Sequence, residues 1–82
     1  MTKEQIIEEC KSRLLSAYAF TRSFAGKQFV RYYVIADHYI DLLLEEYDYD
    51  FLEENEGFAL MYKHCTEAFS DIRIASKKIL YV

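Results

Sequence analysis

Proline is absent from the 82 residues of this chain, and glycine occurs only at positions 26 and 57. These two residue types most often interrupt a helix, so the sequence contains few points at which a helix must stop. The segment YYVIA (residues 32–36) is rich in residues that favour strands, but it lies within a longer helical pattern. The chain is therefore expected to form long helices and no sheet.

Three stretches carry residues of one helix face at alternating steps of three and four. The first row is Ile7, Cys10, Leu14, Ala17, Thr21 and Phe24; the second is Phe29, Tyr33, Ala36, Ile40, Leu43 and Tyr47; the third is Phe58, Met61, Cys65, Ala68, Ile72, Ala75 and Ile79. The rows predict helices over residues 3–24, 28–47 and 51–80. Short turns between them favour an all-α, antiparallel three-helix bundle that forms one domain over residues 1–82.

Signals for the helix ends are present at two places. Thr2 followed by Gln5 matches a capping box at the start of the first helix. Gly26 follows the first row and is expected to supply a left-handed C-terminal cap. The pattern leaves open whether Gly57 interrupts the third helix or lies inside it.

Composition places the chain among folded proteins without a membrane span. Its hydrophobic content is 52%, too high for a disordered chain, and its longest apolar stretches carry charges and fall short of about 18 residues. The first ten residues are polar and periodic, unlike a signal peptide. We therefore expect a cytoplasmic protein without membrane insertion, in which Cys10 and Cys65 are reduced, buried thiols that pair only under oxidising conditions.

The second helix carries an additional apolar row beside its main one. We call it the tyrosine row, and it consists of Tyr32, Ile35, Tyr39 and Leu42. A helix that is apolar over most of its circumference is normally buried, yet a three-helix bundle cannot enclose one helix on all sides. The row either packs between the neighbouring helices or forms a protein-binding surface, with a homodimer as the expected assembly.

Charge is strongly segregated along the chain, whose net charge is −4. Residues 10–36 contain five basic residues and no acid, whereas residues 37–56 contain nine acids and no Lys or Arg. The candidate acidic docking residues are Glu45, Glu46, Asp48, Asp50, Glu53 and Glu54. They could occupy a basic groove of a nucleic-acid-handling protein as a decoy, or simply favour the start of the third helix through its macrodipole.

The sequence contains no recognisable metal or cofactor motif, and no Ser-His-Asp order, glycine-rich phosphate loop or nucleophile elbow. An EF-hand beginning at Asp48 fails because Leu52 occupies its fifth position and the turn glycine is missing. The two histidines and two cysteines lack the spacing of a metal site. Basic residues are sparse and the pI is about 5.1, which disfavours direct binding of nucleic acid.

Arg31 and His38 are seven residues apart and therefore share a helix face. Their spacing resembles the R-x4–6-H element of HEPN-type ribonucleases, in which the Arg and His flank the scissile phosphate in a dimer cleft. The resemblance covers these two residues and implies, as a remote alternative, a minimal ribonuclease. The competing interpretation is a solvated polar strip that also includes Asp37 and Asp41.

Together these patterns favour a small non-enzymatic interaction protein, such as an adaptor, inhibitor or immunity-type factor. Phage and bacterial accessory genes encode many chains of this kind. This comparison is an analogy and rests on no particular residue. The expected mode of action is binding of another protein through the tyrosine row, with the acidic decoy as the second hypothesis.

Overall fold

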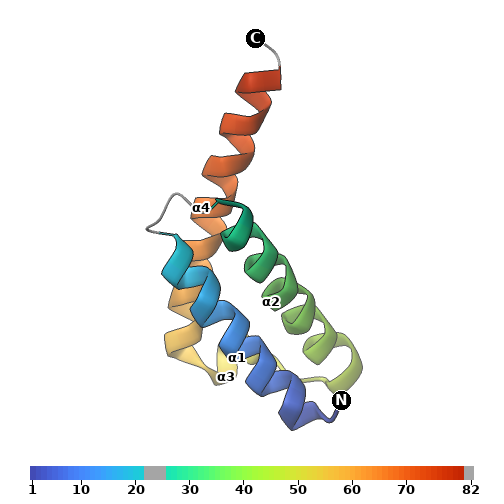
Figure 1. The fold of residues 1–82 in the computed structure, drawn as a ribbon. Helices are drawn as coiled ribbons and strands as arrows, with labels where there is room; N and C mark the ends of the chain where they lie inside the picture. The colour runs from blue at the N-terminus through green and yellow to red at the C-terminus, as the bar shows by residue number, and fades with distance from the viewer. Residues whose placement is uncertain (22–25, 81–82) are drawn as a thin grey trace.

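The computed structural model describes the backbone of residues 1–21 and 26–80 and the side chains of this set as far as residue 72. The helices are α1 (Lys3–Phe20), α2 (Gly26–Tyr47), α3 (Phe51–Glu54) and α4 (Glu56–Leu80). Figure 1 shows α1 and α2 side by side in opposite directions, with α4 returning in the direction of α1. The expected all-α bundle is confirmed. None of the described helices is long and apolar enough to cross a membrane.

The start of α1 follows from its first side chains, whereas its end comes earlier than expected. The Thr2 hydroxyl accepts a hydrogen bond from the Gln5 N–H at 3.2 Å, and the Gln5 side chain accepts one from the Thr2 N–H at 2.8 Å, which confirms the capping box. At the other end, the Thr21 N–H and hydroxyl both donate to the Tyr18 carbonyl, at 3.2 and 2.7 Å. The helix ends at Phe20, and the predicted continuation over residues 22–24 lies outside the described residues.

Helix α2 begins earlier than expected and ends where expected. The expected cap at Gly26 is wrong, because this glycine has no positive φ and is the first residue of α2, two residues before the predicted start. The predicted end at Tyr47 is confirmed. Asp48 then takes a left-handed conformation with φ 51°, and the Tyr49 N–H donates to the Leu43 carbonyl at 3.0 Å. Aspartate is among the few residues other than glycine that enter this region readily.

The predicted continuous helix over residues 51–80 is wrong, because Asn55 divides it into α3 and α4. Asn55 has φ −135° and ψ 77°, and its amide group donates to the Phe51 carbonyl at 2.9 Å and to the Tyr49 hydroxyl at 3.2 Å. The Asn55 side chain thus donates to the Phe51 carbonyl, which would accept from the Asn55 backbone N–H if the helix continued. Gly57 lies inside α4 and interrupts nothing.

The core lies mainly between α1 and α2, whose mutual contact is the most extensive in the fold. Its buried residues are Ile6, Cys10, Leu14 and Ala17 from α1, Phe29, Tyr33, Ala36, Ile40 and Leu43 from α2, Phe51 from α3 and Cys65 from α4. Four assignments differ from the predicted rows: Ile6 rather than Ile7 is buried on α1, Thr21 is only half-buried, Tyr47 is 38% exposed, and Phe51, which belongs to no predicted row, is fully buried. The Phe51 ring packs against Phe58 with centroids 5.8 Å apart.

The third predicted row is less enclosed than the other two. On α4 only Cys65 is fully buried among the described side chains, whereas Phe58, Met61, Ala68 and Ile72 are half-buried. The side chains at 75 and 79 lie outside the described set. The molecule measures 45 × 22 × 21 Å, and the last turns of α4 extend beyond the ends of α1 and α2 in Figure 1.

Candidate protein-binding surface

Helix α4 packs on one flank of the α1–α2 pair. On α1, the Tyr18 ring lies 5.4 Å from the His64 ring, and the Lys11 ammonium lies 5.9 Å from the centre of the Phe58 ring. Lys11 and Tyr18 are seven residues apart and share one stripe of α1. This stripe is therefore the one that faces α4.

A different stripe of α1 meets the tyrosine row. The Phe20 and Tyr32 rings are stacked with centroids 5.7 Å apart and planes inclined by 3°, and the Arg13 guanidinium lies 5.8 Å from the Tyr32 ring centre. Arg13 follows Lys11 by two residues, and Phe20 follows Tyr18 by two. Each therefore points about 160° away, around the axis of α1, from the stripe that faces α4. The tyrosine row therefore lies on the flank of the α1–α2 pair that faces away from α4.

All four residues of the tyrosine row are half-buried, and Tyr32, Tyr39 and Leu42 pack against the core. The structure thus partly covers the row with α1 and leaves its outer edge accessible. We define the open flank as this row together with its two contacts on α1: Arg13, Phe20, Tyr32, Ile35, Tyr39 and Leu42. The sequence pattern did not predict Arg13 and Phe20 as part of this surface, although their seven-residue spacing places them on one stripe of α1.

The contact between α2 and α4 is made by long side chains. The Tyr33 ring lies 5.9 Å from Tyr62 and 4.9 Å from Phe69, measured between centroids. The Tyr62 hydroxyl donates to Asp37 at 2.5 Å. Thr66 donates to the Tyr62 carbonyl at 2.9 Å, so the Tyr33 hydroxyl is the donor in its 3.1 Å bond to Thr66. These rings and hydroxyls attach α4 to α2.

This cluster corrects the placement of Asp37, which was expected on a solvated strip but is half-buried and hydrogen-bonded to α4. Burial, and then the bond to Asp37, raises the pKa of Tyr62 far above its usual value of 10.0. The phenol therefore stays protonated and serves as a donor rather than as a base or nucleophile. The arrangement is that of an interhelical contact.

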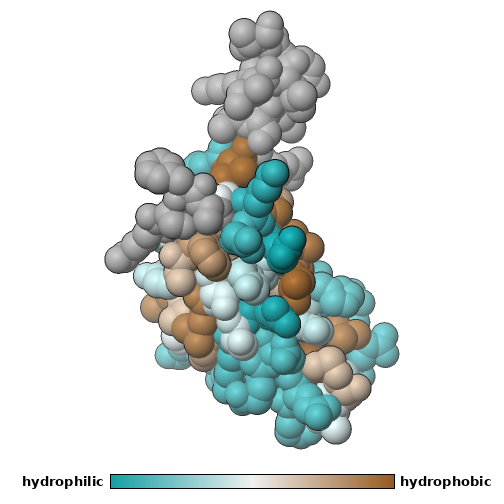
Figure 2. All heavy atoms as spheres, in the orientation of Figure 1, coloured by the Kyte–Doolittle hydropathy of each residue, from teal (hydrophilic) through white to brown (hydrophobic). Residues whose placement is uncertain are grey.

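The acidic docking residues are all exposed. In the described part of the chain, none of them joins an ion pair; the pairs formed there are Lys11–Glu8 and Arg13–Glu9, both within α1. Asp50 also caps α3, accepting from the Glu53 N–H at 3.2 Å. The acids surround the end of the bundle that holds the start of α1, and Figure 2 shows hydrophilic side chains gathered there.

Arg31 and His38 are both exposed on α2, and the His38 ring contacts the adjacent Tyr39 with centroids 5.9 Å apart. Their shared face is consistent with the seven-residue spacing. The ribonuclease alternative stays a prediction, because the structure places the two residues on one exposed face and provides no further test of this activity.

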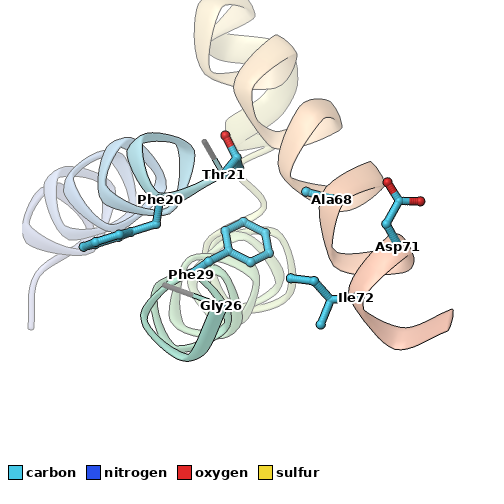
Figure 3. A pocket seen from close by; sticks show the side chains of 7 residues that line it. All are labelled: Phe20, Thr21, Gly26, Phe29, Ala68, Asp71 and Ile72. Atoms are coloured by element: carbon cyan, nitrogen blue, oxygen red, sulfur yellow. The ribbon is translucent and has the colours of Figure 1, made fainter. Parts of the chain in front are cut away.

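A cavity of about 310 Å³ lies where α4 leaves the α1–α2 pair. Its lining residues are Phe20, Thr21, Gly26, Phe29, Ala68, Asp71 and Ile72. Figure 3 shows Phe29 and Ile72 pointing toward one another from α2 and α4. Among the described residues of this lining, Asp71 is the single ionisable side chain, so this part of the wall lacks the several convergent polar groups that orient a small ligand.

Neither cysteine has the character of a reactive site. Both are free and buried, and the Cys10 thiol lies 3.8 Å from the Ala36 carbonyl oxygen. Burial raises the pKa of Cys10 from 9.0 to about 12 and that of Cys65 from 9.0 to about 11. The thiolate is the reactive form, so both groups are inert near neutral pH.

Within the described residues, no group of three or more His, Cys, Asp or Glu side chains could hold a metal ion. The candidate protein-binding surface is the open flank, whose aromatic and aliphatic side chains are half-buried with an accessible outer edge. No protein-family model, curated protein or solved structure matches the chain.

Proposed function

We propose that this chain is a non-enzymatic cytoplasmic interaction protein that binds another protein through the open flank. The observation that carries this proposal is the position of the tyrosine row, half-buried along α2 on the side away from α4. Tyrosine and arginine are the residue types that most often dominate binding energy at interfaces. Such a surface suits an adaptor, an inhibitor or an immunity-type factor.

The open flank is also partly ordered before any partner arrives. Arg13 and Phe20 both contact the Tyr32 ring, and Arg13 is further held by Glu9 through a 3.3 Å hydrogen bond. Side chains that already occupy a fixed position lose less conformational entropy on binding. This pre-organisation favours the open flank over the separately exposed Leu60 on α4.

The proposal is tested with Tyr39→Glu, which places a charge in the open flank, and with Tyr47→Glu as the matched control. Tyr47 lies on the same helix and is 38% exposed, but it is outside the open flank. Each tagged variant is used to capture proteins from cells of the source organism, followed by mass spectrometry. We expect Tyr39→Glu to lose a partner that the wild type and Tyr47→Glu retain, with all three showing equal helical circular dichroism. Retention of every partner by Tyr39→Glu contradicts the proposal.

The second candidate is an acidic decoy, and it is favoured by the six exposed carboxylates that form no ion pair among the described residues. The test combines Glu45→Gln, Glu46→Gln, Asp48→Asn and Asp50→Asn. Asparagine at position 50 preserves the cap of α3, so the fold should be unaffected. If the acids act as a decoy, the wild type should displace nucleic acid from a captured partner and the neutralised variant should not. Equal displacement by both proteins removes this candidate.

A further inference from the structure

The charges on α2 are arranged against the macrodipole of that helix. Lys27 and Arg31 lie exposed near its N-terminus, whereas Asp41, Glu45 and Glu46 lie exposed in its C-terminal half. Positive charge at the N-terminus and negative charge at the C-terminus are both unfavourable for an isolated helix. A second α2 helix in the antiparallel direction would place each basic end beside an acidic end, so the pattern is complementary to itself.

Two apolar residues of the open flank and the charges of α2 together favour one register for such a pairing. Ile35 and Leu42 are seven residues apart and lie on one stripe of α2. When Ile35 is set opposite Leu42 of a second, antiparallel copy, Leu42 is necessarily opposite Ile35 of that copy. The same register sets Arg31 opposite Glu46 of the second copy. Arg31 and Glu46 are exposed, and neither forms an ion pair within the described part of the chain.

We propose that the partner of the open flank is a second copy of this chain, with the two α2 helices antiparallel about a two-fold axis that passes between His38 and Tyr39. This inference rests on the proposed function and names the partner. In a two-fold interface every contact occurs twice, so one Ile35–Leu42 contact and one Arg31–Glu46 contact each generate a symmetric equivalent. The α1–α2 pairs of the two copies then form the centre of the dimer, and α4 of each copy lies outside it.

The Arg31–Glu46 contact provides a direct test by charge reversal. Arg31→Glu sets two acids opposite one another twice in the dimer, and Glu46→Arg does the same with two bases. Because exposed pairs are individually weak but occur twice here, each single variant should raise the dimer dissociation constant about tenfold or more. The double variant restores both contacts, and an equimolar mixture of the two single variants should form a heterodimer. The measurement is sedimentation equilibrium of each sample over a concentration series.

Lys63→Glu and Glu67→Lys serve as the matched control, because both residues are exposed on α4 and their combined reversal leaves the net charge unchanged. These variants should dimerise like the wild type. A wild type that is monomeric throughout the series overturns the inference, as does a dimer whose affinity is unchanged in Arg31→Glu and Glu46→Arg. Failure here is distinct from failure of the proposed function, because loss of a different captured protein in Tyr39→Glu is measured independently of self-association.

Discussion

The contact between α1 and α2 includes several small buried side chains, whereas the contact between α2 and α4 is made by large ones. The first contains Cys10, Ala17 and Ala36, each with 0% exposure, and a thiol 3.8 Å from a carbonyl of the facing helix. The second depends on large rings, with Tyr33 stacked on Tyr62 and Phe69. Small residues allow two helix backbones to approach closely, whereas rings hold them apart while still filling the space between them.

The position of α4 leaves one flank of the molecule open. The close α1–α2 contact forms a two-helix layer, and the rings of Tyr33, Tyr62 and Phe69 attach α4 to one side of it. The tyrosine row lies on the other side, where α1 covers it only partly. The same packing that stabilises the bundle therefore leaves accessible the flank for which we propose a partner.

The largest expected effect is on the layer itself. Leu14 is fully buried in α1, so Leu14→Ala removes packing and leaves a cavity, and it should lower the free energy of unfolding by about 2–5 kcal/mol. Leu15→Ala is the matched control, because Leu15 is 47% exposed on the same helix. Urea unfolding monitored by circular dichroism measures both. Equal losses in the two variants contradict the assignment of the core.

Alkaline pH should destabilise the bundle through its two buried thiols. Their pKa values rise on folding, so the stability they contribute is complete below the unfolded value of 9.0 and declines above it, up to about 12 for Cys10 and about 11 for Cys65. The decline is on the order of 1 kcal/mol per pH unit for each thiol. Unfolding free energies measured from pH 8 to 10.5 should fall less steeply in Cys10→Ala and in Cys65→Ala. Slopes equal to that of the wild type contradict the prediction.

Enlarging a small buried residue should destabilise the contact between α1 and α2. Ala36 is fully buried against α1, and Ala36→Leu overpacks the site and should cost about 1–3 kcal/mol of unfolding free energy. Ala19→Leu makes the same change at an exposed position of α1 and should be nearly neutral. Thermal unfolding distinguishes them. A neutral Ala36→Leu would show that the helices are not in close contact there.

Loss of one hydroxyl should loosen α4 without disturbing the layer. Tyr62→Phe leaves Asp37 without its donor, at a cost of about 1–2 kcal/mol. The effect should be local, so hydrogen exchange should accelerate in α4 more than in α1. Tyr47→Phe, at an exposed position, should change neither measurement. Uniform acceleration across all helices contradicts a separate attachment of α4.

The smallest expected change is a gain in the free energy of unfolding from a substitution just after the end of α2. Asp48 has a φ of 51°, a conformation that glycine adopts without steric cost. Asp48→Gly should therefore raise the unfolding free energy by up to about 1 kcal/mol. Asp41→Gly, in the interior of α2, should instead lower the unfolding free energy. Chemical denaturation resolves the two, and a loss of stability in Asp48→Gly contradicts the assigned backbone conformation.

Much of the fold could be predicted from residue spacing. Buried positions of α2 match the predicted row from Phe29 to Leu43, because one helical face meets the core along its whole length. The helix break could not be predicted from spacing, since it depends on the Asn55 side chain reaching Phe51 and Tyr49 at the same time. The placement of Asp37 failed for a similar reason: its partner, Tyr62, comes from another helix.

The candidate site also contains residues that could be predicted from spacing and residues that could not. The four residues of the tyrosine row could be named from their helical repeat, and the exposed acids from their density along the chain. Arg13 and Phe20 joined the site only through their contacts with Tyr32 on a neighbouring helix. Spacing along one helix specifies which residues share a face, but not which other helix lies against that face.

The sequence by itself determined the all-α class, the main apolar faces and the capping box at Thr2, because each depends on residues within one or two helical turns. Only the tertiary structure decided which flank of the α1–α2 pair α4 occupies. That placement depends on contacts between residues of different helices, here Tyr33 of α2 with Tyr62 and Phe69 of α4. The physical reason is that packing volume is shared between segments far apart in the chain.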